Sequence, residues 1–250
     1  MTTTGTRSSG TTPRGTATEQ EASRWVRGMF GRIAGHYDLL NHLLSFNLDK
    51  RWRARTVERV AGILARPDAR VLDLCCGTGD ILLAMEERGR NPVLGSDFCH
   101  PMLVEANRKI ASRALRTKLF EADGLLLPLA DNTLDLITVG FGFRNFANYE
   151  RGMKEMLRVL KPGGVAAVLE FSQPTNKIFR SLYDFFSTSV LPKVGGLVSG
   201  SSEAYSYLPE SIRKFPGADD LAAQMREAGY AHVEFERMTG GAVALHLARK

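Results

Sequence analysis

The feature that most constrains the fold of this chain is a regular alternation of short apolar segments with amphipathic segments between residues 69 and 171. Strands are predicted at residues 69–74, 92–96, 119–122, 134–139 and 165–171. Helices are predicted between them at residues 80–88, 102–115 and 149–160. A chain that alternates strands with helices builds a mostly parallel sheet with helices on both faces, so we expect a doubly wound α/β fold.

The C-terminal part of the chain predicts a different kind of pairing. Segments 232–238 and 242–248 flank Thr239-Gly240-Gly241, which indicates an antiparallel hairpin. An open, Rossmann-like α/β sheet that finishes in such a hairpin is the layout of class I methyltransferases. We therefore expect this fold class.

Length and local composition predict the domain organisation. A chain of 250 residues suits one α/β domain. Its first residues are rich in Thr, Ser and Gly and have few apolar side chains to bury, so we expect disorder there. The expected organisation is a disordered tail at 1–20 and a single domain at 21–250, with a helical cap at 21–66, a cofactor-binding core at 69–171 and an insertion at 175–213.

Charge and cysteine content limit the cellular locations and partners that the protein can have. The net charge is +6, but the basic residues are scattered, so a solvated basic surface and a membrane-facing patch both remain open. Cys75, Cys76 and Cys99 form neither a disulfide framework nor a metal-ligand spacing, so we expect no metal. No apolar run is long enough to cross a bilayer and the N-terminus lacks a secretory core. We expect a cytoplasmic protein.

The strongest local signal is the turn after the first predicted strand. Asp73 ends the strand, and Gly77, Thr78 and Gly79 let the backbone pass close to a cofactor before the next helix begins. A dinucleotide would need a small residue at the far end of this motif, where Leu82 stands instead. NAD is therefore a poorer candidate than another nucleoside cofactor.

Acidic residues close the next two strands. Asp97 ends the second strand, where a carboxylate can accept hydrogen bonds from ribose hydroxyls, and Asp123-Gly124 comes after the third strand, where an adenine would lie. Each has a local alternative: Asp97 can cap the helix that contains Pro101, and Asp123 can stabilise a turn. Because the ends of successive parallel strands face one crevice, the set predicts S-adenosyl-L-methionine as the cofactor.

The segment after the fourth strand bears on the identity of the methyl acceptor. Amine methylases of this class tend to have an Asn/Asp-Pro-Pro-aromatic motif there, whereas residues 140–145 read Gly-Phe-Gly-Phe-Arg-Asn. The three cysteines fall at the cofactor end, where small-residue packing is the better interpretation than nucleophilic catalysis.

Several motifs together resemble the ubiquinone/menaquinone biosynthesis C-methyltransferase family (UbiE/MenG). The resemblance runs from about residue 25 to the C-terminus. Its most specific elements are Tyr37-Asp38-Leu39-Leu40-Asn41 and Phe141-Gly142-Phe143-Arg144-Asn145. The other segments that match are 45–52, 72–80, 158–164, 169–172, 207–212 and 241–246.

The chain also departs from the family pattern. Asn47 and Asp49 stand where the family usually has Gly and His, so a role for that His does not carry over. Cys75 and Cys76 stand where Ala or Gly is more usual, which predicts a glycine turn slightly further from the cofactor. Gly140 is similar to members that act on menaquinone, while members that also serve ubiquinone often have Ser.

The resemblance implies a reaction, a pathway and a set of residues. The reaction is C-methylation of a demethylated isoprenoid quinol in menaquinone biosynthesis, with ubiquinone biosynthesis left open. The cofactor-binding residues that the resemblance and the glycine turn together imply are Asp73, Gly77, Thr78, Gly79, Asp97, Asp123, Gly124 and Gly140. The catalytic candidates are Arg144, Asn145, Tyr37 and Asp38, with His36 as another candidate base.

The chemistry explains why such residues would be needed. A quinol carbon is a weak nucleophile until the neighbouring hydroxyl ionises, and a phenol titrates near about 10. Arg144 can stabilise the phenolate and Asn145 can fix the ring, although both can instead cap the next helix and pair with an acid.

The substrate also predicts a membrane contact. Each buried methylene contributes about 0.8 kcal/mol, so a prenyl tail leaves the bilayer at high cost. We expect the insertion at 175–213, which has Phe179, Phe185 and Phe186 near Lys177, Arg180 and Lys193, to form a peripheral contact with the inner face of the membrane. The alternative is a cap helix with no substrate contact.

The sequence leaves other functions open. The rivals are methylation of another small aromatic or lipid acceptor and a non-catalytic subunit that only binds the cofactor. RNA methylation is the third, although no appended RNA-binding element is apparent and we expect no nucleic-acid partner. An oligomer is compatible with the sequence.

Overall fold

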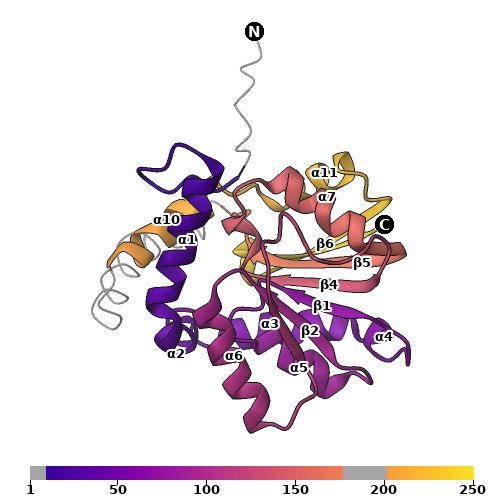
Figure 1. Ribbon diagram of the computed structural model, residues 1–250. Coiled ribbons are helices and arrows are strands. Elements are labelled where there is room, and N and C mark those ends of the chain that lie inside the picture. Colours follow the sequence, from indigo (N-terminus) through magenta and orange to yellow (C-terminus); the bar gives the residue numbers. More distant parts are fainter. Residues whose placement is uncertain (1–9, 177–201) are drawn as a thin grey trace.

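A mixed sheet of seven strands in the order β3-β2-β1-β4-β5-β7-β6 organises the protein, of which the computed structural model describes residues 10–176 and 202–250 (Figure 1). The first five strands run parallel, and β7 pairs antiparallel with both β5 and β6. The strands are β1 (Val71–Leu74), β2 (Val93–Asp97), β3 (Lys118–Glu121), β4 (Leu134–Gly140), β5 (Leu160–Phe171), β6 (His232–Met238) and β7 (Val243–Arg249).

Helices cover both faces of this sheet, and the helices from the N-terminal part of the chain form a cap (Figure 1). The cap contains α1 (Glu19–Ile33), η1 (Ala34–His36), α2 (Tyr37–Leu44), α3 (Leu48–Arg59) and α4 (Ala61–Leu64). The core contains α5 (Asp80–Arg88), α6 (His100–Ser112), η2 (Phe143–Asn145), α7 (Tyr149–Val159), α10 (Ser202–Lys214), α11 (Ala218–Glu227) and η4 (Thr239–Gly241).

The alternation of side chains along each strand divides the apolar core into two halves. Leu72 and Leu74 of β1 pack with α7 and α11 on one face, while Val71 packs with α3 and α5 on the other. All four residues of β1 are buried, because this strand lies in the middle of the sheet. The predicted doubly wound α/β fold and its C-terminal hairpin are therefore confirmed.

One predicted boundary differs from the structure, and the predicted cap contains a break. Within the cap, Val60 has φ −101° and ψ 3° and separates α3 from α4. The strand predicted at 165–171 begins earlier, at Leu160 directly after α7, so Lys161-Pro162-Gly163-Gly164 lies inside β5. Leu160 pairs with Leu134, and the register then shifts, so the segment is taken up as an irregularity of the strand.

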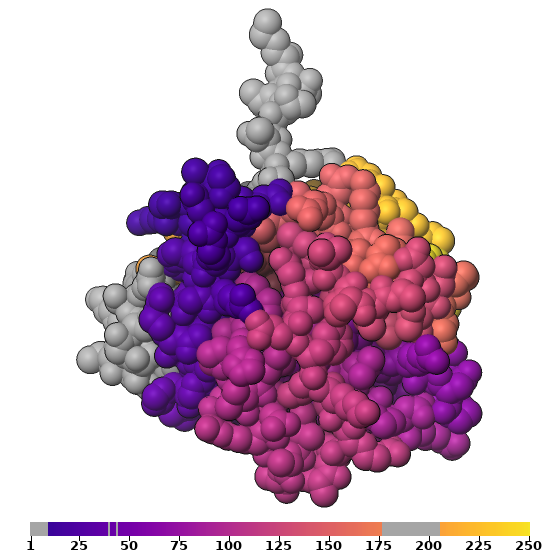
Figure 2. Space-filling view, viewed as in Figure 1, coloured from indigo at the N-terminus to yellow at the C-terminus, as the bar shows by residue number. Residues whose placement is uncertain are grey.

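The prediction of a disordered tail at 1–20 is wrong for residues 10–20. Gly10 and Thr11 are buried, and the Thr11 N–H donates to the Phe146 carbonyl at 2.8 Å. Thr18 caps α1 in a reciprocal capping box with Glu21. We call residues 10–18 the N-terminal segment; it is held by backbone contacts that its polar composition does not reveal. Figure 2 shows the N-terminal part of the chain, in indigo, covering one side of the core.

The predicted insertion at 175–213 is only partly described. The aromatic and basic residues expected to contact the membrane, Phe179, Phe185, Phe186, Lys177, Arg180 and Lys193, lie outside the described residues. The described end of it forms α10, which lies beside α1 (Figure 1). No helix in the described ranges is long and apolar enough to cross a membrane.

Replacement of Leu72 by Ala tests the importance of the central strand. Leu72 has no exposed surface, so Leu72→Ala is expected to lower the free energy of unfolding by about 2–5 kcal/mol. Leu126 is 76% exposed, so the matched Leu126→Ala change is expected to stay within about 0.5 kcal/mol of the parent. Denaturant titration followed by circular dichroism measures both. Equal losses in the two variants would contradict this assignment of the core.

Candidate functional site

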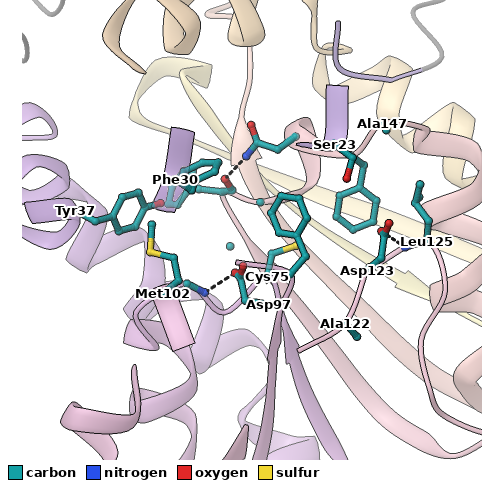
Figure 3. Close-up of a pocket in the computed structure, with 18 residues that line it drawn as sticks. Ser23, Phe30, Tyr37, Cys75, Asp97, Met102, Ala122, Asp123, Leu125 and Ala147 are labelled. Carbon is teal, nitrogen blue, oxygen red and sulfur yellow. Dashed lines mark hydrogen bonds between the residues drawn. The ribbon is translucent and has the colours of Figure 1, made fainter. Parts of the chain in front are cut away.

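A cavity opens at the carboxyl ends of the parallel strands. In Figure 3, Phe30 and Tyr37 lie on one side, Asp123 and Leu125 on the opposite side, and Asp97 and Cys75 between them. The residues that line the cavity come from the ends of the strands, from the cap and from the η2 turn. The lining residues are Ser23, Phe30, Tyr37, Cys75, Gly77, Asp97, Phe98, Met102, Ala122, Asp123, Gly124, Leu125, Gly140, Phe141, Gly142, Asn145, Phe146 and Ala147.

The floor of the cavity is the glycine turn after β1. Gly77 and Gly79 have φ of 55° and 89°, in the left-handed region that favours glycine. Leu82, which counts against a dinucleotide, is accommodated on the far side of the turn because β2 has Gly95 there; a Cβ at residue 95 would overlap the Leu82 side chain. The backbone of this turn can therefore come close to a bound ligand, and the helix that follows the turn packs tightly on β2.

Asp97 holds this turn in place. Its Oδ2 accepts a hydrogen bond from the Gly77 N–H at 2.9 Å, and its Oδ1 accepts one from the Cys99 N–H at 2.8 Å. Burial raises the pKa of Asp97 to about 6, although these backbone donors oppose the shift. The alternative interpretation of Asp97 as a local cap is thus correct in part, because one carboxylate both ties two loops together and faces the cavity.

Asp123 and the adjacent glycines form another wall. The Asp123 Oδ1 accepts from the Leu125 N–H at 2.9 Å, so this residue also stabilises a turn while it lines the cavity. A Cβ at Gly124 would come within 2.5 Å of the Phe146 ring, and a Cβ at Gly140 would overlap Ile81. These glycines are needed because neighbouring apolar side chains occupy the space beside them.

Three of the predicted cofactor-binding residues do not line the cavity. Asp73 is buried behind the turn, where its carboxylate accepts from the Thr138 hydroxyl at 2.5 Å, and burial raises its pKa to about 7. Gly79 begins α5 and packs against Ala106. The Thr78 hydroxyl donates to Asp38 at 2.5 Å and so points away from the cavity, into a network of charged side chains.

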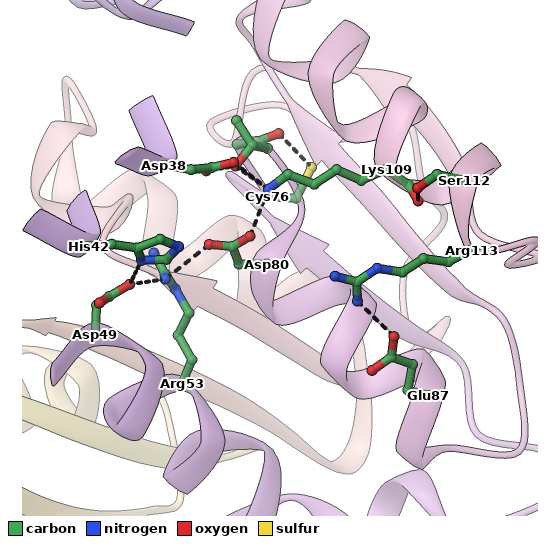
Figure 4. Close-up of polar contacts among 12 residues, drawn as sticks. Asp38, His42, Asp49, Arg53, Cys76, Asp80, Glu87, Lys109, Ser112 and Arg113 are labelled. Carbon is green, nitrogen blue, oxygen red and sulfur yellow. Dashed lines mark hydrogen bonds and ion pairs between the residues drawn. The ribbon is translucent and has the colours of Figure 1, made fainter. Parts of the chain in front are cut away.

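This ion-pair network lies beside the turn and joins the cap to the core (Figure 4). Lys109 on α6 contacts Asp38 at 2.5 Å and Asp80 at 2.7 Å. Arg53 on α3 contacts Asp80 at 3.0 Å and also pairs with Asp49. Although burial raises the pKa of Asp80, Arg53 and Lys109 hold it below its ordinary value. The network fixes α2 and α3 against the glycine turn.

The departure from the family pattern at Asp49 has a structural counterpart here. The Asp49 carboxylate contacts His42 Nδ1 at 2.7 Å and accepts from the Ser45 hydroxyl at 2.6 Å. Ligand atoms of His42, Asp49 and Asp80 all lie within 4.8 Å of one another. Arg53 pairs with both carboxylates and Lys109 also pairs with Asp80, so cationic side chains already lie against these two acids.

Of the predicted catalytic residues, Tyr37 and Asn145 line the cavity, whereas Asp38 and Arg144 do not. Burial raises the pKa of Tyr37, which keeps its hydroxyl neutral. Arg144 belongs to η2 and is buried, and its Nη1 donates to Glu170 at 3.0 Å and to the Phe141 carbonyl at 2.5 Å. The sequence left open that Arg144 pairs with an acid, and the structure shows that pairing.

The cysteines behave as packing residues. Cys75 lines the cavity with a positive φ of 55°, and its Cβ lies where a side chain at Gly142 would otherwise be. Burial raises the pKa of Cys75 and of Cys76 well above the ordinary value, so both remain thiols. This agrees with the prediction that they pack rather than act as nucleophiles.

The sequence interpretation missed part of the site. Phe30, Phe98 and Met102 form an apolar wall, and Phe146 lies under Gly124. The sequence assigned no role to Glu170, which accepts hydrogen bonds from the backbone and side chain of Arg144. The helical periodicity of α1 could have indicated Phe30, whereas no local signal distinguishes the others from ordinary core residues.

The residues present fit S-adenosyl-L-methionine. The apolar wall of the cavity can pack against an adenine. Carboxylates at Asp97 and Asp123 suit ribose hydroxyls and the positive groups of the cofactor. Gly77, Gly124 and Gly140 keep the floor free of side chains.

Comparison with known proteins gives a consistent result. The model of the ubiE/COQ5 methyltransferase family matches residues 16–250. The demethylmenaquinone methyltransferase of Thermus thermophilus is 47% identical over 220 residues, which cover 88% of this chain and 98% of the relative. The ubiquinone/menaquinone biosynthesis C-methyltransferase UbiE of Idiomarina loihiensis is 39% identical, with 88% of each chain covered.

Solved structures show the same fold. A SAM-dependent methyltransferase from Aquifex aeolicus superimposes with a TM-score of 0.56 at 18% identity, covering 78% of this chain and 88% of its own. The cyclase SpnF superimposes with a TM-score of 0.68 at 17% identity, covering 97% and 98%. The sheet and its helices are thus those of class I methyltransferases, while the chemistry on such a fold depends on the site.

The raised pKa of Asp97 predicts a pH dependence of cofactor binding. Below pH 6 the carboxyl becomes neutral and accepts fewer hydrogen bonds, so affinity for the product analogue S-adenosylhomocysteine is expected to fall as the pH drops. With a pKa of about 6, about a tenth of the groups are ionised at pH 5, which predicts an affinity about tenfold weaker there than at pH 7. Isothermal titration calorimetry at the two pH values measures this affinity.

The Asp97→Asn variant identifies the titrating group. It is expected to bind S-adenosylhomocysteine weakly with a flat pH profile, because the side chain no longer titrates. Asp73 is the matched control, since its pKa is also raised but it does not line the cavity, so Asp73→Asn should keep the pH dependence. A pH-dependent Asp97→Asn together with a flat Asp73→Asn would assign the titration to Asp73 instead.

Proposed function

The chain belongs to the ubiE/COQ5 methyltransferase family, and from that membership we propose that it transfers a methyl group to a ring carbon of demethylmenaquinol, giving menaquinol. It is an S-adenosyl-L-methionine-dependent methyltransferase of the menaquinone/ubiquinone group. The observation that carries the acceptor assignment is the match to demethylmenaquinone methyltransferases along most of both chains. Tyr37 and Asn145, which belong to the two most specific motifs of the sequence, both line the cavity.

The reaction requires alignment more than acid–base power. When bound, S-adenosyl-L-methionine would supply a methyl group carried on a positively charged sulfur. Transfer of that group to the ring carbon would leave a neutral thioether, and the hydrogen of that carbon would be released as a proton to bulk water. The cavity walls contribute by holding the ring against the methyl group, and the apolar wall of Phe30, Phe98 and Met102 excludes water.

Asn145 supports the negative charge that develops on the quinol oxygen. Its side chain reaches the cavity and can donate a hydrogen bond there. Arg144 is buried next to it and pairs with Glu170, which offsets its charge, and it also donates to the Phe141 carbonyl. We therefore assign Arg144 to holding the turn that carries Asn145.

Tyr37 and Asp38 take different roles in this proposal. The Tyr37 ring packs edge-on against Phe30, with ring centroids 5.9 Å apart, so it forms part of the cavity wall. Asp38 pairs with Lys109 and Thr78 outside the cavity, so we assign it to holding the cap rather than to proton abstraction. His36 is exposed and does not line the cavity, so it is not retained as a base.

Methyl transfer by an Asn145→Ala variant tests the proposed reaction. Incorporation of label from methyl-labelled S-adenosyl-L-methionine into reduced demethylmenaquinone is expected to fall about 10²–10³-fold, the usual effect of removing a donor to a developing oxyanion. Binding of S-adenosylhomocysteine should change little. Asn107 is exposed on α6, so Asn107→Ala is the matched control and should keep full activity.

The acceptor is identified by the parent protein in the same assay. Label is expected in demethylmenaquinol, and the demethylated ubiquinone precursor shows whether a second pathway is served. Cofactor binding with no label in either quinol would contradict the proposal and favour another aromatic or lipid acceptor, an RNA, or a non-catalytic binding subunit. Label in Asn145→Ala equal to that of the parent would remove Asn145 from the mechanism.

A peripheral contact with an anionic membrane is the second part of the proposal. Leu39 and Leu43, on one face of α2, are 60% and 47% exposed, and Phe46 just beyond the helix is 73% exposed. Lys50 and Arg51 on the next helix are also exposed. An apolar stripe beside cations suits a bilayer with anionic lipids, and α2 begins at Tyr37 in the cavity wall.

Co-sedimentation with phosphatidylcholine/phosphatidylglycerol vesicles tests this surface. The Leu39→Ser/Leu43→Ser variant is expected to bind at least about tenfold more weakly, since insertion of each leucine is worth roughly 1.5–3 kcal/mol. Leu126→Ser removes another exposed leucine, away from α2, and should bind as the parent does. Unchanged vesicle binding by the double variant would contradict the proposal. A change in oligomeric state of the double variant relative to the parent would also contradict it, because α2 would then contact a second copy of the chain.

A further inference from the structure

Tyr207 lies against the substrate end of the cavity without lining it. It is a buried residue of α10, and its ring packs against Trp25 of α1 with ring centroids 5.0 Å apart. Burial raises the pKa of its hydroxyl, which therefore stays protonated and carries a single proton to donate. The partners of that hydroxyl decide what Tyr207 can do.

The hydroxyl of Tyr207 is the middle of a buried hydrogen-bond chain. It donates to Asn145 Oδ1 at 2.9 Å and contacts Thr11 Oγ1 at 2.7 Å. Because its one proton is used on Asn145, the Thr11 hydroxyl must donate to Tyr207. The chain therefore runs in one direction, from Thr11 through Tyr207 to the amide oxygen of Asn145.

The Phe141 carbonyl fixes the orientation of the Asn145 amide, and with it the direction of the chain. With Oδ1 turned toward Tyr207, Nδ2 lies on the other side, 3.5 Å from the Phe141 carbonyl. The opposite orientation would place Oδ1 against that carbonyl, and two acceptors repel each other. One weak contact does not use both Nδ2 hydrogens, so the amide keeps a donor for the cavity that Asn145 and Phe141 both line.

The N-terminal segment closes the chain from the outside. The Thr11 N–H donates to the Phe146 carbonyl at 2.8 Å, and Gly10 lies so close to the Ala147 backbone that it has no room for a side chain. The Lys214 ammonium on α10 donates to the Thr12 carbonyl at 2.9 Å. The two elements that supply Thr11 and Tyr207 are thus fastened to each other and to the loop that carries Asn145.

We propose that Tyr207 and Thr11 are positioning residues that hold Asn145 with its Nδ2 directed at the acceptor's ring oxygen. The inference rests on the proposed function, because Asn145 is the group that contacts the quinol. It adds two residues from distant parts of the chain that touch neither the cofactor nor the acceptor. They fix the orientation of one amide, which then presents an N–H donor. Such a donor favours an acceptor whose ring bears a hydrogen-bond-accepting, partly ionised oxygen.

Steady-state kinetics of Tyr207→Phe test this role in the full chain. The variant keeps the ring that packs on Trp25 and removes only the hydroxyl. The rate constant kcat for methylation of reduced demethylmenaquinone is expected to fall about threefold to tenfold, the usual effect of one lost neutral hydrogen bond. The KM for S-adenosyl-L-methionine should stay unchanged, because Tyr207 does not line the cavity.

A double-mutant comparison separates positioning from general damage. Tyr207→Phe should have no further effect in an Asn145→Ala background, because the amide that it orients is gone. Thr11→Val should reproduce part of the Tyr207→Phe loss, and Thr11→Ser, which keeps a hydroxyl, should restore activity. Tyr230→Phe is the matched control, because it removes another buried tyrosine hydroxyl, which donates to the Met153 carbonyl at 3.2 Å. Tyr230 does not line the cavity, so this variant should keep the kcat of the parent.

Each outcome has a defined meaning. Independent, multiplicative losses from Tyr207→Phe and Asn145→Ala would overturn the inference, as would full activity of both Tyr207→Phe and Thr11→Val. If Tyr207→Phe fails to fold by circular dichroism, the Thr11→Val and Thr11→Ser pair decides the question. Absence of label in the quinol with the parent protein would overturn the proposed function itself, which distinguishes the two failures.

Discussion

The parallel pairing of β1 with both β2 and β4 is the constraint on which the rest of the structure depends. Val71 is in register with Val93 on one side and with Leu136 on the other. Parallel neighbours place the loops after their carboxyl ends at one edge of the sheet, so the glycine turn, Asp97 and Gly140 must meet there. Since all of β1 is buried, the turn at its end is anchored in the most stable part of the core.

The buried carboxylates show how stability and binding compete at this edge. Asp97 lies in an environment that disfavours its charge, as its raised pKa of about 6 records, and backbone N–H groups of Gly77 and Cys99 partly offset that cost. A neutral side chain there would remove the cost but would also remove an acceptor for a bound ligand. The ion pairs of Arg53 and Lys109 with Asp80 then hold the cap over the turn, where its aromatic residues complete the cavity.

The sheet does not by itself determine the chemistry. A cyclase superimposes on nearly the whole chain at 17% identity, so the shared α/β core is compatible with a different reaction. Outside the sheet, the cap and η2 line the cavity, while Tyr207 of α10 links Thr11 of the N-terminal segment to Asn145. The match to the family model runs from residue 16 to residue 250, so it covers the cap, η2 and α10 as well as the sheet.

The sequence by itself determined the strands, the C-terminal hairpin, the fold class and most of the cavity floor, because hydrophobic periodicity and glycine turns are local properties. It also determined the family through motifs. Only the tertiary structure decided which side chains face the cavity: Thr78 turns toward Asp38, Arg144 turns toward Glu170, and Tyr207 reaches Asn145 across 62 positions of sequence. It likewise showed that Gly10 and Thr11 are buried and that Thr11 bonds to the Phe146 carbonyl. Such contacts depend on long-range packing and on the pairing of buried polar groups, neither of which leaves a periodic signal in the chain.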